Sequence, residues 1–307
     1  MQKKDSDILV SVSLITYNHK NYIRRAIDSI LMQEVDFNYE VIIGDDFSSD
    51  GTQEILIEYQ QKYPERIYLI LHPRDYDNIP GRINNTTNLY ACRGKYIAML
   101  DGDDFWITKD KLKKQVAFLE QNQEYSICFH NAIVFSEESQ FDEYKQDEKH
   151  PILKKRSSFN QTDIASGFSF VPASSIIFRN NSFKEFPEWF WNVYSADYAL
   201  LLILTGMGKA KYLENIYSAY RKNQNSFTII NKSRNDELKK QINQLKILED
   251  NFKGLSFAKR KALIFYLHSS KFFKNKLYVK MLNSMFKSLK NDPSKIWLYL
   301  NFLKKGN

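Results

Sequence analysis

The sequence predicts an α/β fold, with a mostly parallel sheet between two layers of helices and a helical extension at its C-terminal end. Residues 8–135 alternate short apolar strands with amphipathic helices over short connections, and repeated units of this kind form parallel sheets. Acidic residues follow two of these strands directly, where a parallel sheet gathers them at one edge. From about residue 235 onward the apolar residues recur at helical spacing.

The strands and helices of the first half follow from the spacing of apolar residues along the chain. Residues 10–15 alternate apolar and polar side chains, as a strand does. From Tyr22 to Leu31 the apolar residues return every three or four positions, which is typical of a helix. Residues 39–44 form an apolar run and the second strand. The turn at 48–51 can cap a helix from Thr52 to about Tyr63, which a proline ends.

The same alternation continues to residue 135. A third strand at 67–71 is followed by a polar loop and by a helix over roughly 83–92, which a glycine ends. The strand at 95–100 comes next. A helix over 110–121, with its leucines and valine facing inward, and a strand over 126–134 complete the series.

The second half of the chain is less regular. Residues 136–165 are first acidic and then basic, which is typical of an exposed insertion or loop. Four features are expected after it: a strand at 174–178, an aromatic-rich stretch at 186–194, a helix from Asp197 to about Leu204 and a strand near 210–213. Beyond residue 235 we expect three or four helices, with a break at Asp292-Pro293.

Charge is distributed unevenly along the chain. From Asn251 to the end, 13 Lys or Arg residues and one acid give a net charge of +12, whereas the whole chain carries +8 and residues 1–250 therefore −4. This distribution argues against a nucleic-acid-binding protein, which would be basic throughout. Cys92 and Cys128 match no metal-ligand spacing, so we expect two reduced thiols in the core of a cytosolic protein.

Clustered carboxylates at strand ends are the strongest functional signal in the sequence. Two groups stand out, Asp45 with Asp46 after the second strand and Asp101, Asp103 and Asp104 after the strand at 95–100. Like charges this close repel, and each disfavours ionisation of its neighbour. A divalent cation carrying a phosphorylated ligand would offset this repulsion best, and we expect such a site at this edge of the sheet.

Three segments of the chain, two of which contain these acids, resemble the family 2 glycosyltransferases. They are VSVSLITYN at 10–18, EVIIGDDFSSDGT at 40–52 and RGKYIAMLDGDDFW at 93–106, in the order and at the spacing of that family. The resemblance covers roughly the first 130 residues and, more loosely, reaches about residue 225. It implies the GT-A fold, a Rossmann-like α/β/α sandwich, and a metal-dependent, hexosyl-type transfer that inverts the anomeric configuration.

The resemblance also implies a division of the chain. A GT-A catalytic domain is expected over residues 1–230, with its nucleotide-binding half at about 8–135 and its acceptor half at about 136–230. Residues 231–307 are expected to form a basic helical region.

The resemblance gives roles to the residues after the first two strands. Thr16, Tyr17 and Asn18 offer a hydroxyl, an aromatic ring and an amide that would hold the nucleoside, although an ordinary turn with an Asn cap explains them too. Asp46 or Asp45 would accept a hydrogen bond from the uracil N–H, which favours a UDP-sugar donor. The alternative is a turn that only caps the next helix.

Asp101-Gly102-Asp103 resembles the Asp-x-Asp motif of these enzymes. The family assigns Asp101 to the ribose or the metal shell and Asp103 to the metal, a Mn²⁺ or Mg²⁺ ion that bridges the diphosphate oxygens and acts as a Lewis acid on the leaving group. Acids in a solvated turn are the alternative. Arg82, on the polar loop, would approach the donor phosphates or the base, unless it is a solvated surface residue.

Asp197 is the expected catalytic base. In the family an Asp at the start of such a helix deprotonates the acceptor hydroxyl, which attacks the anomeric carbon opposite the leaving group. Asp is also a preferred helix cap, and Asp163 and Glu185 are weaker candidates for the base.

Residues 220–223 read Tyr-Arg-Lys-Asn, where the family often has Tyr-Arg-x-His with the His near the metal. Asn223 thus puts a third protein metal ligand in doubt, and Arg221 or Lys222 would instead meet the pyrophosphate. His130 ends a strand, and it either lines the acceptor side or lies in the core.

The basic tail allows two interpretations. Its Lys and Arg residues beside Phe, Leu, Tyr and Trp fit a helix that lies on an anionic membrane, as lipid-linked acceptors at the cytoplasmic face would suggest. A packed helical subdomain with a basic outer face fits equally well. No apolar segment follows the N-terminal residues, so no signal peptide is expected, and the apolar stretch at 198–204 is too short to span a bilayer.

We therefore expect an inverting glycosyltransferase that moves a sugar from a nucleotide donor, a UDP-sugar above all, to a hydroxyl of a glycan or lipid-linked glycan in surface polysaccharide synthesis. A nucleotidyltransferase is one alternative, but it usually needs a glycine-rich loop after the first strand, and residues 16–20 contain no glycine. An inactive sugar-nucleotide-binding or scaffolding subunit is another, because of Asn223. We expect the residues that select the sugar and the acceptor to lie within 136–195, where we find no motif.

Overall fold

The computed structural model describes residues 8–73, 81–136, 144–145, 148, 150, 152–167, 171–180, 185–222, 237–275, 277–296 and 299. The chain forms two compact units. The first contains the residues up to 159 together with 170–186 and 204–223, and the second contains 160–169, 187–203 and the residues from 224 onward. A domain boundary at residue 230 remains a prediction.

The first unit is built on one mixed sheet. In the described part of the chain its order is β3-β2-β1-β4-β9-β6-β10-β5, with β7 paired to β6 and β8 to β10. The strands are β1 Val10–Thr16, β2 Tyr39–Asp45, β3 Ile67–Leu71, β4 Tyr96–Asp101, β5 Phe105–Trp106, β6 Tyr125–Phe135, β7 Tyr144–Lys145, β8 Ser158–Phe159, β9 Ile177–Arg179 and β10 Lys209–Arg221. The first four strands in this order are parallel to one another, and β6 is parallel to β10, whereas β9 is antiparallel to both β4 and β6. The predicted α/β fold is confirmed.

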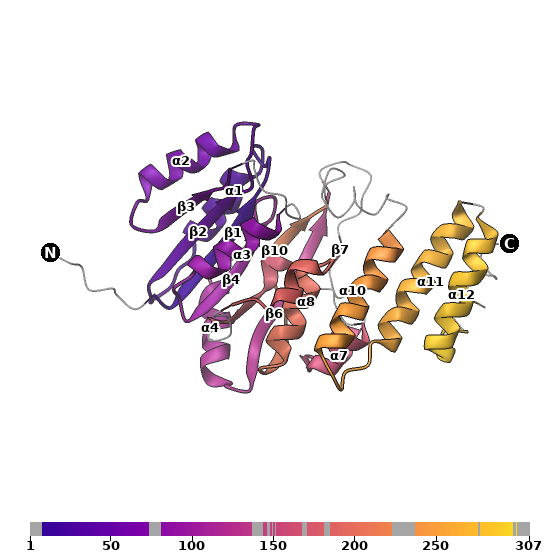
Figure 1. Ribbon diagram of the computed structural model, residues 1–307. Coiled ribbons are helices and arrows are strands. Elements are labelled where there is room, and N and C mark those ends of the chain that lie inside the picture. The colour runs from indigo at the N-terminus through magenta and orange to yellow at the C-terminus, as the bar shows by residue number, and fades with distance from the viewer. Residues whose placement is uncertain are drawn as a thin grey trace. The chain divides into compact units, whose positions relative to one another are not determined.

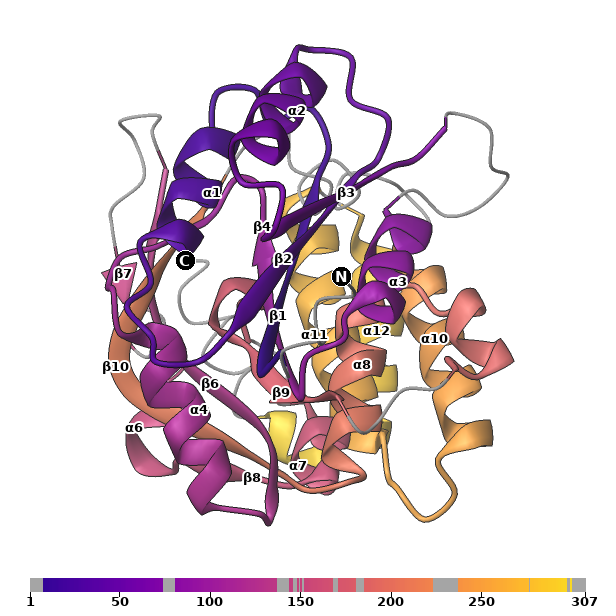
Figure 2. The same ribbon diagram turned by 90° about the vertical axis from the view of Figure 1, so that its left-hand side faces the viewer.

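Helices cover both faces of this sheet. They are α1 Ile23–Leu31, α2 Thr52–Lys62, α3 Arg82–Ala91, α4 Lys111–Gln121 and the short α6 Ile152–Lys155. Figure 2 shows α3 on one face of the sheet and α1 and α4 on the other. Because β2 and β4 lie on opposite sides of β1, the strand order reverses at β1. Sheets of this type bind ligands outside the carboxyl ends of the strands at such a reversal.

The hydrophobic core explains why these elements form. Val10, Val12 and Leu14 of β1 are completely buried, and so are Ile23 and Ile27 on the inner face of α1. Burying an aliphatic side chain of this size stabilises the fold by about 1.5–3 kcal/mol relative to leaving it exposed. The apolar alternation in the sequence therefore marks the central strand and its covering helix.

The structure differs from the prediction in its short strands. The strand expected at 174–178 is a 3₁₀ turn, η1 Ala173–Ser175, followed by the three-residue β9. Strands of two or three residues are too short to show alternation in the sequence. The strand expected near 210–213 is the much longer β10, because irregular pairing with β6 near Leu213 and Ile216 interrupts the alternation that would reveal its full length.

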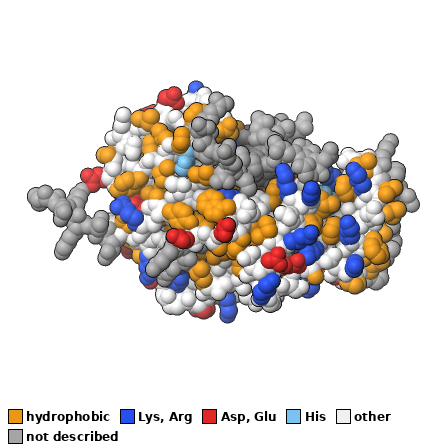
Figure 3. Space-filling view, in the orientation of Figure 1, with side chains coloured by type: hydrophobic (Ala, Val, Ile, Leu, Met, Phe, Trp, Pro, Cys, Tyr) orange, Lys and Arg blue, Asp and Glu red, His pale blue; other side chains and the backbone are white. Residues whose placement is uncertain are grey.

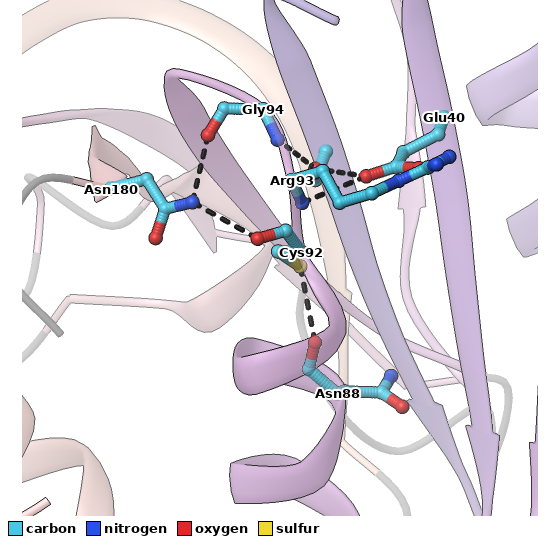
Figure 4. Close-up of polar contacts among 7 residues, drawn as sticks. Glu40, Asn88, Cys92, Arg93, Gly94 and Asn180 are labelled. Carbon is cyan, nitrogen blue, oxygen red and sulfur yellow. Dashed lines mark hydrogen bonds and ion pairs between the residues drawn. The ribbon is translucent and has the colours of Figure 1, made fainter. Parts of the chain in front are cut away.

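An ion pair between a buried glutamate and a half-exposed arginine joins the amino-terminal ends of the central strands (Figure 4). Glu40 of β2 is only 1% exposed, and it accepts hydrogen bonds from the Ser11 hydroxyl at 2.6 Å and from the Arg93 guanidinium at 2.6 Å. Gly94 donates its N–H to the same Ser11 hydroxyl, and a Cβ at this glycine would lie 2.5 Å from the Ser11 nitrogen. The start of β4 can approach β1 this closely only because residue 94 is a glycine.

Asparagine side chains join α3 to the sheet near the other ends of the strands. Asn84 donates to the carbonyl of Gly44 at 3.0 Å, and Asn88 donates to the carbonyls of Leu14 and Ile42 at 2.9 and 3.1 Å. A Cβ on Gly44 would lie 2.0 Å from Asn84 Oδ1, so a glycine is required there. The polar face of α3 thus belongs to the packing of β1 and β2.

The second unit is helical, as the sequence predicts for the C-terminal part. Its described elements are α7 Gln161–Ser166, η3 Glu188–Asn192, most of α8 Ala196–Thr205, α10 Glu237–Asn251, α11 Ala258–Lys274, α12 Tyr278–Asn291 and η4 Pro293–Lys295. Figure 1 shows α10, α11 and α12 side by side. Ser288 joins the last two by donating to the Ala262 carbonyl at 2.8 Å. Among the described helices, none is long and apolar enough to cross a membrane.

Candidate active site

The carboxyl ends of three neighbouring strands meet at one edge of the sheet. In the parallel ladders Thr16 of β1 pairs with Asp45 of β2, and Ile15 pairs with Asp101 of β4. The predicted gathering of the two acidic groups around the end of β1 is therefore confirmed. This edge lies at the reversal of strand order, where ligands of such sheets bind.

The turn after β1 is tied to the turn after β2. Asn18 has a φ of 52°, and its side-chain oxygen accepts from the Ser49 N–H at 2.9 Å, while its own N–H donates to the Ser48 hydroxyl at 2.8 Å. Thr16 is buried, whereas Tyr17 is 56% exposed and leaves its ring available to a ligand. Asn18 thus shapes the turn, and nucleoside contacts of Thr16, Tyr17 and Asn18 remain a prediction.

The two acids after β2 have different surroundings. Asp45 is fully buried, and its carboxylate accepts hydrogen bonds from the backbone and hydroxyl of Ser48 and from Gln53 Nε2 at 2.6 Å. Among the residues that the structure describes, Asp46 accepts from the Gly81 N–H, at 2.9 Å through Oδ2. Its Oδ1 is buried and has no hydrogen-bond partner within the described residues, and burial raises the pKa of this carboxyl above its usual value. Asp46 therefore keeps an open acceptor, whereas Asp45 is engaged inside the turn.

The turn after β4 is packed tightly against the turn after β1. Gly102 donates its N–H to the Ile15 carbonyl at 2.8 Å. A Cβ on Gly102 would lie 2.7 Å from Thr16 Oγ1 and 2.8 Å from His19 Nδ1. The central residue of the Asp-x-Asp motif must therefore be a glycine in this protein, because any side chain would displace those two groups.

His19 is a site residue that the sequence reasoning missed. Its Nδ1 lies 3.2 Å from Thr16 Oγ1, and its Nε2 lies 3.9 Å from Asp103 Oδ2. Burial lowers the pKa of His19, although the neighbouring Asp103 carboxylate acts in the opposite direction. The sequence offered one signal for His19, its position directly after the Thr16-Tyr17-Asn18 motif. A search for the spacing of metal ligands does not find this residue.

Asp104 and Arg221 form the buried base of the acidic turn. Asp104 is 1% exposed, and its Oδ1 accepts from the backbone N–H of Arg221 at 2.8 Å. Burial, together with the charges of Asp103 and Asp101, raises the pKa of Asp104 well above its usual value. The Arg221 side chain donates from Nε to the Asp103 carbonyl at 2.9 Å, and its guanidinium lies 4.3 Å from the centre of the Tyr22 ring.

Arg82 is the first residue of α3 and is only 4% exposed. The alternative that it is a solvated surface arginine is therefore wrong. His130 is also buried: its Nδ1 lies 2.8 Å from the Asn131 carbonyl, and its ring meets the Tyr217 ring edge-on. Burial lowers the pKa of His130 well below its usual value. Of the two alternatives, His130 is therefore the neutral histidine in the core.

The predicted base belongs to the second unit. Asp197 lies in the first turn of α8. Its rival Asp163 forms a capping box with Asn160 and accepts the Asn160 N–H at 2.8 Å, so its carboxylate has a structural use. The role of Asp197 as a base remains a prediction. Asn223 and residues 137–143, which make up most of the acidic segment, lie outside the described residues.

A divalent cation fits the donor set of this site. Within the described ranges no cluster of three or more His, Cys, Asp and Glu side chains is arranged to hold a metal ion by itself. Magnesium-type ions in nucleotide sites commonly use one or two protein carboxylates and take their other ligands from phosphates and water. Asp101 and Asp103, beside the closely packed Gly102 turn, match that smaller requirement.

Comparison with protein families matches residues 11–186 to the family described as Glycosyl transferase family 2. The uncharacterized protein Rv1520 of Mycobacterium tuberculosis is 33% identical over 214 residues, which are 69% of this chain and 58% of that protein. The glucosyltransferase WfgD of Escherichia coli, which uses UDP-Glc and a GlcNAc-diphosphoundecaprenol, is 34% identical over 42% of this chain and 50% of its own length. The putative teichuronic acid glycosyltransferase TuaG of Bacillus subtilis is 40% identical over 36% of this chain and 42% of its own length.

Solved structures show the same fold at low sequence identity. TarS 1–349 of S. aureus, in complex with UDP-GlcNAc, has a TM-score of 0.61 at 18% identity, over 92% of this chain and 81% of its own. The mannosyltransferase PcManGT of Pyrobaculum calidifontis, in complex with GDP-Man and Mn²⁺, has a TM-score of 0.52 at 15% identity, over 94% of this chain and 90% of its own.

Proposed function

The chain belongs to glycosyl transferase family 2, and from that premise we propose that it transfers a sugar from a UDP-sugar to a hydroxyl of a glycan or lipid-linked glycan during surface polysaccharide synthesis. The observation that carries this proposal is the meeting of the turns that carry Asp46, Asp101 and Asp103 around the end of β1, with an unused acceptor on Asp46. Relatives that act on such glycans, WfgD and TuaG, support the class of acceptor.

Asp46 is the residue from which we propose the identity of the nucleotide's base in the sugar donor. A carboxylate oxygen that is buried without a partner is costly, and a ligand N–H removes that cost. The imide N–H of uracil is such a donor, and the exposed ring of Tyr17 offers a surface on which the base could pack. TarS in complex with UDP-GlcNAc supports a uridine nucleotide, whereas PcManGT in complex with GDP-Man makes guanosine nucleotides the alternative to exclude.

Asp103 and Asp101 would hold a Mn²⁺ or Mg²⁺ ion. Such an ion, when bound, neutralises charge on the diphosphate and so helps it to leave. The chain's own part is to fix the two carboxylates. Arg221 holds the backbone of Asp103, and Gly102 keeps the turn against Thr16.

Asp197 is proposed as the general base. It would take the proton of the acceptor hydroxyl while the oxygen attacks the anomeric carbon from the face opposite the departing nucleoside diphosphate, which inverts the configuration. A positioned base of this kind contributes roughly 10²–10⁴-fold to the rate. The N-terminal turn of α8 is a rigid element on which such a carboxylate can be held.

The test is a panel of UDP- and GDP-sugars incubated with Mn²⁺, with Mg²⁺ or with EDTA, in which release of free sugar is measured. We expect cation-dependent hydrolysis of a UDP-sugar, abolished by Asp103→Asn, while Asp197→Asn keeps UDP affinity and loses transfer to an acceptor. An inactive subunit would bind UDP with metal and release no sugar. A nucleotidyltransferase would instead form sugar nucleotide from a nucleoside triphosphate and a sugar phosphate. Activity with GDP-sugars alone would refute the assignment of Asp46 to uracil.

We also propose that α12 holds the enzyme at an anionic membrane, on the cytoplasmic face where lipid-linked acceptors would be met. Val279, Leu282 and Phe286, here named the α12 stripe, are 74%, 54% and 70% exposed and share one face of the helix. The opposite face is buried through Ser284 and Ser288. Exposed lysines at 280, 287 and 290 accompany the stripe, and Figure 3 shows hydrophobic and basic side chains next to one another over this region. A helix with an apolar stripe and lysines beside it suits an anionic lipid surface.

Flotation with vesicles tests the membrane proposal. The protein should float with vesicles containing phosphatidylglycerol, less so in high salt, and the variant with Val279, Leu282 and Phe286 all changed to Ser should bind at least tenfold more weakly. A control with the exposed Ile57 and Met207 of the first unit changed to Ser should bind like the unchanged protein. Equal binding of both variants, or no binding at low salt, would refute a lipid-binding role for the stripe.

A further inference from the structure

We propose that His19 is a second kind of ligand to the divalent cation of this site, binding it through Nε2 beside the Asp103 carboxylate. This inference rests on the proposed function, because the cation is the one that the nucleotide donor would bring. It pairs a nitrogen donor from the turn after β1 with the Asp103 carboxylate of the turn after β4, and the other ligands would come from the diphosphate and water.

The distance between the two atoms allows both to reach one ion. His19 Nε2 and Asp103 Oδ2 are 3.9 Å apart. Metal–ligand bonds of about 2.0–2.3 Å place adjacent donors of an octahedral ion roughly 3 Å apart and opposite donors roughly 4–4.5 Å apart. The observed separation lies between these two values, so a movement of about 1 Å or less would let the two side chains share a cation.

The same distance speaks against a simpler role. At 3.9 Å the two atoms are too far apart to hydrogen-bond. His19 therefore does not hold the Asp103 carboxylate in place directly. Both side chains are partly accessible, 21% for His19 and 15% for Asp103, so a ligand can reach the space that they face.

A hydrogen bond between its other ring nitrogen and the Thr16 hydroxyl orients the imidazole as a metal ligand requires. Metal-ligating histidines almost always use the other ring nitrogen for a hydrogen bond that fixes the ring. His19 Nδ1 lies 3.2 Å from Thr16 Oγ1, so the tautomer with its proton on Nδ1 donates to this hydroxyl and leaves the Nε2 lone pair for the ion.

The packing of Gly102 supports the same arrangement. A Cβ there would lie 2.8 Å from His19 Nδ1 and 2.7 Å from Thr16 Oγ1. The bare backbone of residue 102 therefore makes room for the imidazole and its hydroxyl partner next to the acidic turn.

A nitrogen donor also shifts metal preference, because imidazole suits transition-metal ions better than Mg²⁺. We expect Mn²⁺ to bind more tightly than Mg²⁺.

Pulsed electron paramagnetic resonance of bound Mn²⁺ tests the proposal without any measurement of activity. With UDP and Mn²⁺ present, the full chain should show ¹⁴N modulation from a directly bound imidazole, which becomes ¹⁵N modulation when histidine is labelled with ¹⁵N. His19→Gln should abolish this modulation and weaken Mn²⁺ binding about tenfold. His268→Gln, a change of the same chemistry in the second unit, should alter neither. Where His19→Gln fails to fold, an unchanged spectrum on labelling still refutes the proposal, because it shows that no histidine binds the ion.

The outcomes separate this inference from the proposed function. If Mn²⁺ binds with UDP but histidine labelling leaves the spectrum unchanged, or if the modulation persists in His19→Gln, the role of His19 is refuted and the proposed transfer stands. If Mn²⁺ does not bind with either UDP or GDP, both are refuted. Modulation lost only in His19→Gln establishes the ligand.

Discussion

The backbone N–H of Arg221 donates to Asp104 Oδ1 over 2.8 Å and thereby joins the end of β10 to the acidic turn after β4. The two residues are 117 positions apart in the chain. This bond separates the functions of adjacent carboxylates. Asp104 is buried under the turn, whereas Asp103 keeps a partly accessible side chain for a ligand.

Asp103→Asn should therefore weaken ligand binding, whereas Asp104→Asn should not. Asp103→Asn removes a charge from the cation site, and Mn²⁺-dependent UDP binding should fall at least 100-fold. Asp104→Asn keeps an oxygen for the Arg221 N–H and removes a buried carboxyl whose pKa burial raises, so binding should stay within about threefold and thermal stability at pH 8 should not fall. Calorimetric titration and a thermal melt measure the two effects. Equal loss of UDP binding in both variants would contradict this division.

Asp46→Asn should weaken UDP binding about 10- to 100-fold with little change in stability. The variant can still accept the Gly81 N–H through its amide oxygen, but it then presents an NH₂ group in place of the buried, unpartnered Oδ1 of Asp46. Two donors would face each other, and an unsatisfied polar contact of this type costs about 1–3 kcal/mol.

Asp45→Asn is the matched control for that experiment. The Asp45 carboxylate accepts from both Ser48 and Gln53, so an amide there leaves one donor without its acceptor. The melting temperature should fall, while UDP affinity of the folded protein stays within about threefold. The base-reading role of Asp46 fails if Asp45→Asn lowers UDP affinity as much as Asp46→Asn does.

Gly102→Ala should damage the site without unfolding the protein. The new Cβ would press on the side chains of Thr16 and His19, both at the rim of the sheet. We expect Mn²⁺·UDP affinity to fall about tenfold or more and the melting temperature to change little. Gly94→Ala is the contrasting variant, because its Cβ would meet the backbone of Ser11 at 2.5 Å and should lower the free energy of unfolding by roughly 2 kcal/mol or more. A similar loss of stability in both would show that Gly102 serves the fold.

These differences between neighbouring residues explain what could be predicted from the sequence. Apart from the two-residue β5, the strands and helices up to α4 have local signals, such as the alternation in β1 and the helical spacing of α1, and the sequence predicts them within a few residues. The edge of the sheet that carries the site followed from where the acids stood relative to those strands.

The division of labour within that site could not be predicted, because distant residues set it. The accessible Asp103 and the buried Asp104 look alike in the sequence, and only the N–H from β10 distinguishes them. Arg82 is buried as the first residue of α3, although its polar neighbours suggested a surface loop. His19 meets Asp103 only because Gly102 lets the two turns approach, a contact between residues that the sequence separates by more than 80 positions.

Lys111 should make the free energy of unfolding depend on pH. It is fully buried at the start of α4, and its Nζ lies 4.1 Å above the centre of the Trp106 ring. Nζ has no hydrogen-bond partner among the residues that the structure describes. Burial lowers the pKa of Lys111 to about 7, far below the roughly 10.4 of a lysine in the unfolded chain. The unfolded state therefore binds more protons between these two values, and this group makes the free energy of unfolding rise with pH across that window.

Lys111→Met removes the effect, so the variant should be more stable than the unchanged protein at pH 7. That advantage should shrink by roughly 1.5 kcal/mol between pH 7 and pH 8.5, as the buried amine loses its proton in the folded protein. Burial raises the pKa of the thiols of Cys92 and Cys128, which opposes the rise in stability only above about pH 8.5, outside the interval that is compared. Urea unfolding at the two pH values measures the difference. Lys114→Met, on the exposed face of the same helix, should show no such dependence, and an equal trend in both variants would rule out the buried amine as its source.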